Sequence, residues 1–420
     1  MFNSIKLASK AIRRNKVRTG LTTLGIVIGV GAVILVLSAG AGFEGFINAQ
    51  VDAYGTNTIF VETRVPPTAK ARESGTSSMT GDIDRAMSSV VITSLKDSDI
   101  EDIKRLPNVA TAYGIAADQK VVSFQDQVKI ALIFGTGTER FDMDTTKLVE
   151  GRPFTEAENL SVSQVAIIGN KLAKDLFGQN DPVGKQVKVK DLNFEIVGVY
   201  EEKGSMGGMD TDNSLFVPLK TAQKKLLGID YLLMILVQAK DKNLSSATAE
   251  DIRLTLRDNH QIKDAYKDDF NVMTAAEGLD IFNSIFAGIT FLLISIAAIS
   301  LVVGGVGIMN IMYVIVTERT SEIGLKKALG AKNRDIRTEF LAEAIFITVI
   351  GGIVGILLGA FLSFILSLIA KTTLSDWAFV LPLNAVIIAI SVSASIGLIF
   401  GVLPATRAAK LDPIEALRYE

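Results

Sequence analysis

The sequence predicts an α-helical membrane domain with four transmembrane helices plus a large α+β extracytoplasmic domain inserted between the first and second helices. Three observations predict this class. Four long runs are almost free of charge, and runs of at least about 18 apolar residues are typical of membrane-spanning helices. The long segment after the first run is charged throughout and contains no run of that kind. The segments expected on the opposite side of the membrane are basic, which places them in the cytoplasm.

Composition excludes several classes of function. Hydrophobic residues make up 49% of the chain and charged residues 21%, so it divides into membrane and soluble parts, because a fully embedded chain would carry fewer charges. A net charge of −2 gives no indication of a nucleic-acid partner. The chain has no cysteine, so neither disulfides nor thiolate metal sites can form. The single histidine, His260, lies in a polar helical segment and is expected at the surface.

The amino-terminal segment, residues 1–20, is basic and has no acidic residue. Apolar residues at helical spacing predict a cytoplasmic amphipathic helix lying on anionic membrane lipids. The alternative is an unstructured basic tail that only sets topology. The first transmembrane helix is predicted at residues 21–43. Gly25 and Gly29 form a pair of small residues four apart, which lets another helix approach closely.

Residues 44–280 show the pattern of a soluble α+β domain. Residues 66–89 are rich in Pro, Ser, Thr and Gly, which indicates a mobile loop. The sequence GQNDPVGK, residues 178–185, departs from a phosphate-binding loop because five residues separate its glycines and Gln186 follows it. We interpret it as a turn before a strand and expect no nucleotide site in this chain.

We also expect no catalytic residues, no metal site and no cofactor in this chain. Three acidic pairs lack the spacing of a calcium-binding loop and are expected to be solvated turns: Asp142 and Asp144, Asp210 and Asp212, and Asp268 and Asp269. A lone surface histidine cannot support a Ser-His-Asp arrangement. An intramembrane enzyme is disfavoured because no paired carboxylates lie within the spans.

The remaining spans are predicted at residues 281–317, 341–370 and 383–403. From about residue 275, the second helix would reach roughly 60 Å, twice the hydrocarbon thickness of about 30 Å, so part of it projects outward as a stalk. Gly304, Gly305 and Gly307 are the expected bend or close-approach point. The third span carries three glycines at four-residue spacing, expected to pack against a neighbouring helix: Gly351, Gly355 and Gly359. A short outer loop, 371–382, holds Trp377 as an interfacial anchor, and residues 404–420 form a cytoplasmic tail.

The segment around which the chain is organised is residues 317–330, at the start of the cytoplasmic loop, residues 318–340. Its first part predicts a helix, because Glu322 and Lys326 stand at i and i+4 and Gly330 follows as a carboxy-terminal cap. One interpretation is a solvated turn that only obeys the charge rule. The other is a lever that a cytosolic partner binds.

Four stretches of sequence resemble the MacB-like permeases of ABC transporters, in the FtsX-like superfamily. They are ERTSEIGLKKALGA in the cytoplasmic loop, KLASKAIRRNKVRTGLTTLGIVIGV at the start, GVLPATRAAKLDPIEALRYE at the end, and EGRPFTEAE through VAIIGNKLAKDLFGQNDPVGKQV to FEIVGVYEEKG in the outer domain. The resemblance spans nearly the whole chain, in order. It implies a permease that acts as a mechanical transmitter, with no substrate channel through the membrane.

The resemblance also implies partners and site residues. Two copies of the permease would pair with two separate ATPase subunits, which bind the ATP and magnesium, and a periplasmic adaptor protein is a further expected partner. The coupling of the ATPase is assigned to the following residues: Glu318, Arg319, Glu322, Ile323, Gly324, Leu325, Lys326, Lys327, Leu329 and Gly330. Among them, Ile323 and Leu329 are the expected apolar anchors, and Gly324 the point where a partner backbone approaches closely.

The resemblance implies export of a drug, peptide or similar substrate. The alternatives are a mechanical transmitter that regulates a cell-wall hydrolase or signalling, or a permease that extracts lipoproteins. For the outer domain the resemblance, together with turn-rich junctions near Gly135 and Gly228, implies two lobes. The lobe nearer the membrane takes residues 50–135 and 229–275, and the inserted lobe takes residues 136–228.

Overall fold

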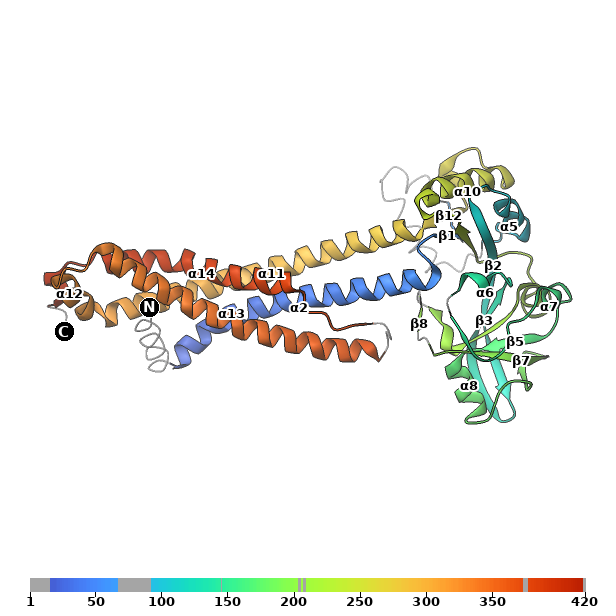
Figure 1. The fold of residues 1–420 in the computed structure, drawn as a ribbon, viewed down its shortest axis with the longest axis horizontal. Helices are drawn as coiled ribbons and strands as arrows, with labels where there is room; N and C mark the ends of the chain where they lie inside the picture. The colour runs from blue at the N-terminus through green and yellow to red at the C-terminus, as the bar shows by residue number, and fades with distance from the viewer. Residues whose placement is uncertain are drawn as a thin grey trace. The chain divides into compact units, whose positions relative to one another are not determined.

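The computed structural model describes residues 16–66, 92–144, 146–202, 205–206, 209–372 and 377–417. These residues form two compact units (Figure 1). One unit holds the membrane helices, and the other runs from Ile47 to Phe282. Most of the predicted amino-terminal amphipathic helix and of the predicted mobile loop at 66–89 lies outside the described residues, as do Asp376 and the last three residues.

The membrane unit consists of long helices joined by short segments. Four of them are long and apolar enough to span a membrane, with mean hydropathy between 2.5 and 2.7 over the most apolar window. The helices are α2 (Lys16–Tyr54), α11 (Ala275–Glu318), α12 (Thr320–Ala328), α13 (Asn333–Lys371), α14 (Leu383–Ala409) and α15 (Pro413–Leu417). The helix α2 continues past the predicted end of the first span at Phe43, because no proline or charge cluster interrupts its helical sequence there.

Glycines let the backbones of three membrane helices approach closely. On α2, a Cβ atom at Gly25 would lie 2.9 Å from the Cα of Gly304 on α11, and one at Gly29 would lie 2.6 Å from Cγ of Leu301. On α13, a Cβ at Gly355 would lie 2.9 Å from the carbonyl oxygen of Val27 on α2. Helices in lipid associate through close packing rather than through the hydrophobic effect, so these contacts are a main source of cohesion.

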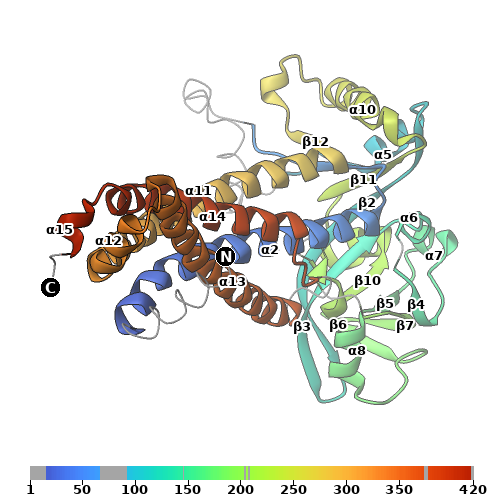
Figure 2. The same ribbon diagram turned by 60° about the vertical axis from the view of Figure 1, so that its left-hand side comes forward.

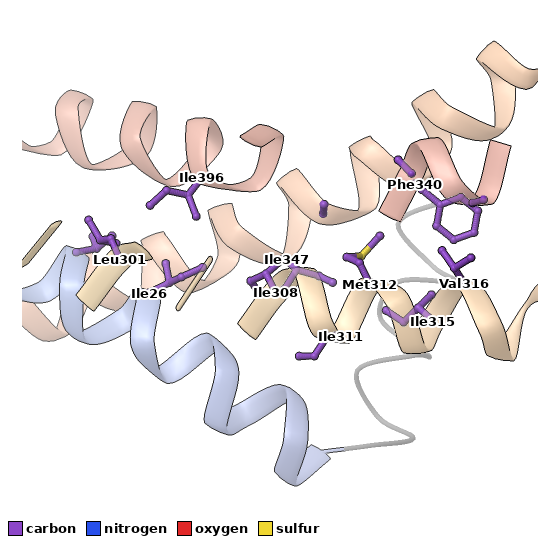
Figure 3. Packing of buried hydrophobic residues seen from close by; sticks show 14 of the residues in the cluster. Ile26, Leu301, Ile308, Ile311, Met312, Ile315, Val316, Phe340, Ile347 and Ile396 are labelled. Atoms are coloured by element: carbon purple, nitrogen blue, oxygen red, sulfur yellow. The ribbon is translucent and has the colours of Figure 1, made fainter. Parts of the chain in front are cut away.

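The other two glycines of the α13 stripe also face α2. A Cβ at Gly351 would lie 3.4 Å from Cγ2 of Ile26, and one at Gly359 would lie 2.6 Å from the carbonyl oxygen of Gly31. Between the helices, buried side chains from α2, α11, α13 and α14 form one apolar cluster (Figure 3). Near the outer end, Trp377 packs edge-on against Phe43 with ring centroids 6.0 Å apart.

The second unit is built on a ten-stranded mixed sheet in the described part of the chain. Its order is β12-β1-β11-β2-β3-β10-β5-β7-β4, and β6 pairs with both β2 and β7. Only the pairs β10–β3 and β5–β7 are parallel. The strands are β1 (Thr58–Thr63), β2 (Val109–Phe124), β3 (Gln127–Thr136), β4 (Leu148–Gly151), β5 (Val165–Ile168), β6 (Gln186–Val189), β7 (Leu192–Tyr200), β10 (Ser214–Pro218), β11 (Met234–Ala239) and β12 (Phe270–Thr274). A separate hairpin pairs β8 (Ser205–Met206) with β9 (Met209–Asp210).

Short helices cover the sheet (Figure 2). The main ones are α5 (Asp97–Lys104), α6 (Arg140–Met143), α7 (Glu156–Leu160), α8 (Asn170–Phe177), α9 (Leu219–Thr221) and α10 (Ser245–Asn259). Apolar residues of α5 and α10 share a core with β1, β11 and β12, whereas those of α8 share a core with β5, β6 and β7. The long hairpin β2–β3 contributes to both cores. The sheet therefore continues through the predicted boundary at Gly135, and the division of this domain into two lobes stays a prediction.

The structure confirms the turn predicted at residues 178–185, which lies between the end of α8 and the start of β6. Two other expectations for this domain are wrong. The acidic pairs are not simple solvated turns: Asp144 is buried against Arg140, with Oδ2 3.1 Å from Nη2, Asp212 is buried, and Asp268 accepts hydrogen bonds from Arg257. His260 is not a surface residue either, because its side chain is only 8% exposed.

His260 lies between two carboxylates, Asp99, which is far away in the sequence, and Asp269, which follows nine residues later. Its Nδ1 lies 2.8 Å from Oδ1 of Asp269, and its Nε2 lies 3.4 Å from Oδ2 of Asp99. Hydrogen bonds to Asp269 and Asp99 raise the pKa of His260 to about 9. Burial alone would raise the pKa of Asp99, but the hydrogen bond from His260 lowers it below its usual value. The polar sequence around His260 gave no sign of this site, because Asp99 and Asp269 lie outside that segment.

The pH dependence of this cluster is the first prediction. Because the pKa of His260 is raised in the folded state, its stabilising effect is complete below the unfolded pKa of about 6.5 and is lost as pH rises through about 9. His260 is the only histidine, so its ring signals in an NMR titration are unambiguous. We expect them to titrate near pH 9, and a midpoint near 6.5 would contradict the assignment.

The glycine contacts give the second prediction. Gly359→Val places side-chain atoms against the backbone of α2, and overpacking of this kind costs about 1–3 kcal/mol. We expect a lower melting temperature of the full chain in detergent. The matched control is Gly288→Val on α11, where a Cβ would meet nothing within 4 Å. Equal melting temperatures for the two variants would show that the α13 stripe does not hold α2.

Candidate coupling site

The predicted cytoplasmic loop begins with a short helix, α12, which follows α11 after a single residue. Arg319 has φ −106° and ψ 15°, so it breaks the direction of the helix between Glu318 and Thr320. Backbone hydrogen bonds continue across the break, from the Arg319 N–H to the Ile315 carbonyl (3.0 Å) and from the Ile323 N–H to the Arg319 carbonyl (3.0 Å). Gly330 has φ +97°, a conformation that favours glycine, and its N–H donates to the Lys327 carbonyl at the end of α12.

Five charged side chains hold α12 against the start of α13. Arg319 donates from Nε to Glu322 (2.9 Å), from Nη1 to Glu343 (3.0 Å) and from Nη2 to Glu339 (3.4 Å). Lys326 donates from Nζ to Glu339 (2.8 Å) and lies 3.0 Å from Glu322. We call these five residues the charge cluster. Glu339 and Glu343 were not among the predicted site residues, because their spacing from Arg319 in the sequence gives no sign of contact.

Two members of the charge cluster, Glu322 and Lys326, are held in their charged forms by their neighbours. Hydrogen bonds from Arg319, and then from Lys326, lower the pKa of Glu322 to about 2. Burial would lower the pKa of Lys326, but hydrogen bonds to Glu339 and Glu322 raise it above the ordinary value. The hydrogen bonds from Arg319 and Lys326 therefore stabilise the carboxylate of Glu322, and the carboxylates stabilise the ammonium of Lys326.

Two predicted contact residues point into the chain itself. Ile323 is 2% exposed and belongs to the apolar cluster of the membrane helices, so it cannot serve as an anchor for a partner. Gly324 is buried against α15: a Cβ there would lie 2.9 Å from Cβ of Ala416. The close approach expected at Gly324 is thus made by the carboxy-terminal segment of this chain. Periodicity could not distinguish an inward from an outward face on so short a helix.

The helix α15 forms part of the same surface, which sequence reasoning missed. The Nζ atom of Lys327 donates to the Leu411 carbonyl oxygen over 2.6 Å, which ties α12 to the segment before α15. Four apolar side chains remain exposed on the two helices: Leu325 (54%) and Leu329 (80%) on or directly after α12, and Ile414 and Leu417 on α15. We call these four residues the apolar surface.

The chemistry of the site suits the docking of a partner. The side chains at its surface are apolar or paired cations and carboxylates, and no group of three or more potential metal ligands occurs among the residues that the structure describes. Interfaces concentrate binding energy in a few apolar anchors with charged residues at the rim. Leu325 and Leu329 fit the first role. Glu318 lies exposed at the rim, whereas Lys326 and Lys327 are engaged within the chain.

Comparison with known families covers most of the chain. The family model for the MacB-like periplasmic core domain matches residues 19–254, and the model for the FtsX-like permease C-terminal matches residues 294–413. The second match contains α12 and the charge cluster, and it ends at the first residue of α15. The first ends within α10, so it covers the first membrane helix and most of the sheet.

Three relatives illustrate the similarity. The macrolide export ATP-binding/permease protein MacB of Bdellovibrio bacteriovorus is 36% identical, with 100% of this chain and 62% of that protein covered. The pyoverdine export ATP-binding/permease protein PvdT of Pseudomonas syringae pv. syringae is 34% identical, with 100% and 60% covered. An uncharacterized ABC transporter permease of Bacillus subtilis, YknZ, is 33% identical, with both chains covered completely. The chain therefore spans about three fifths of the first two relatives.

Packing of Gly324 against α15 gives the third prediction. Gly324→Trp should displace α15, because no tryptophan fits between α12 and Ala416. The chain has no cysteine, so a spin label at Glu415→Cys reports on α15 alone. We expect its EPR spectrum to sharpen in Gly324→Trp as the label becomes mobile, and to stay unchanged in the control Ala328→Trp, where the residue is exposed. An unchanged spectrum in Gly324→Trp would mean that α15 is held elsewhere.

Proposed function

This chain belongs to the MacB-like permeases of ABC transporters, in the FtsX-like superfamily, and on that premise we propose that it couples ATP hydrolysis in a cytoplasmic ATPase subunit to movement of its extracytoplasmic domain. It is a multi-pass protein of the inner membrane, with residues 44–280 outside and the charge cluster inside. The work that this movement performs is the export of a drug, peptide or similar substrate. Two relatives support export, since their names specify macrolide and pyoverdine export.

The observation that carries the proposal is an apolar surface on a helix that is fixed to the membrane helices. Leu325 and Leu329 are exposed, while Ile323 on the same helix is buried among membrane helices. A partner that binds Leu325 and Leu329 and moves α12 therefore also moves Ile323, which packs against the membrane helices. An ATPase that contacts this surface differently in its two nucleotide states would bias the helices between two arrangements.

The helix α11 provides the connection to the outer domain. It begins at Ala275, directly after β12, and ends at Glu318, one residue before α12. At about 1.5 Å per residue, its 44 residues extend roughly 66 Å, more than twice the hydrocarbon thickness of about 30 Å. Its first turn is capped reciprocally: the Thr274 N–H donates to Glu277 (2.8 Å), and the Glu277 N–H donates to Thr274 Oγ1 (3.1 Å). One uninterrupted helix thus links the coupling site to the sheet.

Binding of an ATPase subunit to this surface is the fourth prediction. Leu329→Asp or Leu325→Asp buries an unpaired charge at the centre of the interface, so we expect a loss of about 2 kcal/mol, or roughly thirtyfold in affinity. The tagged chain is purified from membranes of its own host, and the bound ATP-binding subunit and its ATP hydrolysis are measured. Leu254→Asp, an exposed leucine of the extracytoplasmic domain, is the matched control.

Two results would contradict the proposal. If no ATP-binding subunit co-purifies with the wild-type chain, the proposal that it works with such a subunit fails. Normal binding and hydrolysis in both leucine variants would show that the ATPase acts through another surface. Co-purification that is lost in both variants and kept in Leu254→Asp supports the assignment.

A further inference from the structure

Arg319 is assigned to the ATPase interface by resemblance, but its geometry is that of an internal joint. Its side chain is only 16% exposed, and its guanidinium nitrogens donate to Glu322, Glu339 and Glu343. The guanidinium carbon also lies 5.3 Å from the centroid of the Phe340 ring on α13. With these partners inside the chain, Arg319 has little surface left for a second protein.

Arg319 stands at the junction of two helices and contacts a third. Arg319 is the single residue between α11 and α12, and its non-helical ψ creates the break between them. Its side chain crosses to α13, where Glu339 and Glu343 lie on successive turns. Backbone and side chain of one residue therefore join three helices. A change in the angle between any two of them has to move this guanidinium relative to its carboxylates.

Burial makes the joint stiff. Glu343 is 4% exposed, and among the residues that the structure describes its Oε1 has no hydrogen-bond partner, while its Oε2 accepts from Arg319. A buried carboxylate without its cation is strongly disfavoured, and planar guanidinium groups hold carboxylates in fixed directions. Arg319 cannot leave Glu343 without exposing that carboxylate to an apolar environment.

We propose that Arg319 is a positioning residue that clamps the α11–α12 break to α13, so that force applied to α12 moves both membrane helices together. The inference rests on the proposed function, because the force comes from the ATPase subunit. The exposed leucines bind the partner, and Arg319 converts that binding into movement of the helices. Without the clamp, α12 keeps its contacts through Lys326 and Ile323, but a load on it moves it relative to α13.

The clamp is tested first without any partner. Spin labels are introduced into the full, cysteine-free chain at the exposed positions Ser321→Cys on α12 and Thr338→Cys on α13, and the distribution of distances is measured by EPR. The background chain should give one narrow distribution. Arg319→Gln should broaden it at least about twofold, while Arg337→Gln, which removes an exposed arginine of the same loop, should leave it unchanged.

Further variants keep the test decisive if Arg319→Gln fails to insert. Glu343→Gln should broaden the distribution less than Arg319→Gln, since Arg319 keeps Glu322 and Glu339. The double variant should be no broader than Arg319→Gln alone, because both changes remove one interaction. If Arg319→Gln and Glu343→Gln both give distance distributions as narrow as that of the background chain, the clamping role of Arg319 is wrong.

The second arm uses the ATP-binding subunit that co-purifies with the wild-type chain. A positioning role predicts that Arg319→Gln still binds this subunit and supports ATP hydrolysis. Labels on α12 and α13 of the membrane unit should show no nucleotide-dependent change in distance in the wild-type chain, because the two helices move together. In Arg319→Gln they should show one, because α12 then moves without α13. Loss of binding instead would make Arg319 an interface residue and overturn the proposal. If even the wild-type chain binds no such subunit, the proposed function fails, whereas the distance widths still decide the clamp.

Discussion

Inside a lipid bilayer every backbone N–H and C=O needs a partner within the protein, and charged side chains are excluded. This constraint determines the layout of the membrane unit. Each apolar segment folds as an uninterrupted helix, and the charged segment between α11 and α13 is confined to the cytoplasmic surface. There it folds back on the ends of the helices that carry it. The buried position of Ile323 and the cluster around Arg319 both follow from this confinement.

Buried charges occur in both units, and two of them, His260 and Arg319, are each stabilised by several partners. His260 lies between Asp99 and Asp269 in the sheet domain, and Arg319 lies among three carboxylates at the membrane surface. A buried charge is costly unless its partners replace the lost water, so such sites favour a single geometry. In the outer domain this fixes the end of α10 between α5 and β12. In the membrane unit it fixes α12 on α13, which is what a lever requires.

Sequence patterns predicted the features that depend on local composition. The four spans, the basic cytoplasmic side and the helix after Thr317 follow from runs of apolar residues, charge asymmetry and the pair Glu322 and Lys326. The glycine stripe on α13 is visible as a four-residue repeat, although its partner α2 is not. What the sequence could not give is the direction of single side chains. Ile323, Gly324 and His260 were misplaced because their neighbours, including α15, are distant in the chain.

The central claim is that α12 presents Leu329 outward to an ATPase subunit while Ile323 stays within the chain. Site-specific photo-crosslinking measures this most directly, with a photoreactive amino acid placed at Leu329 in one variant and at Ile323 in another, in membranes of the native host. The account predicts an adduct with an ATP-binding subunit from Leu329 and only intramolecular products from Ile323. An intersubunit adduct from Ile323, or none from Leu329 when the ATP-binding subunit is present, would contradict it.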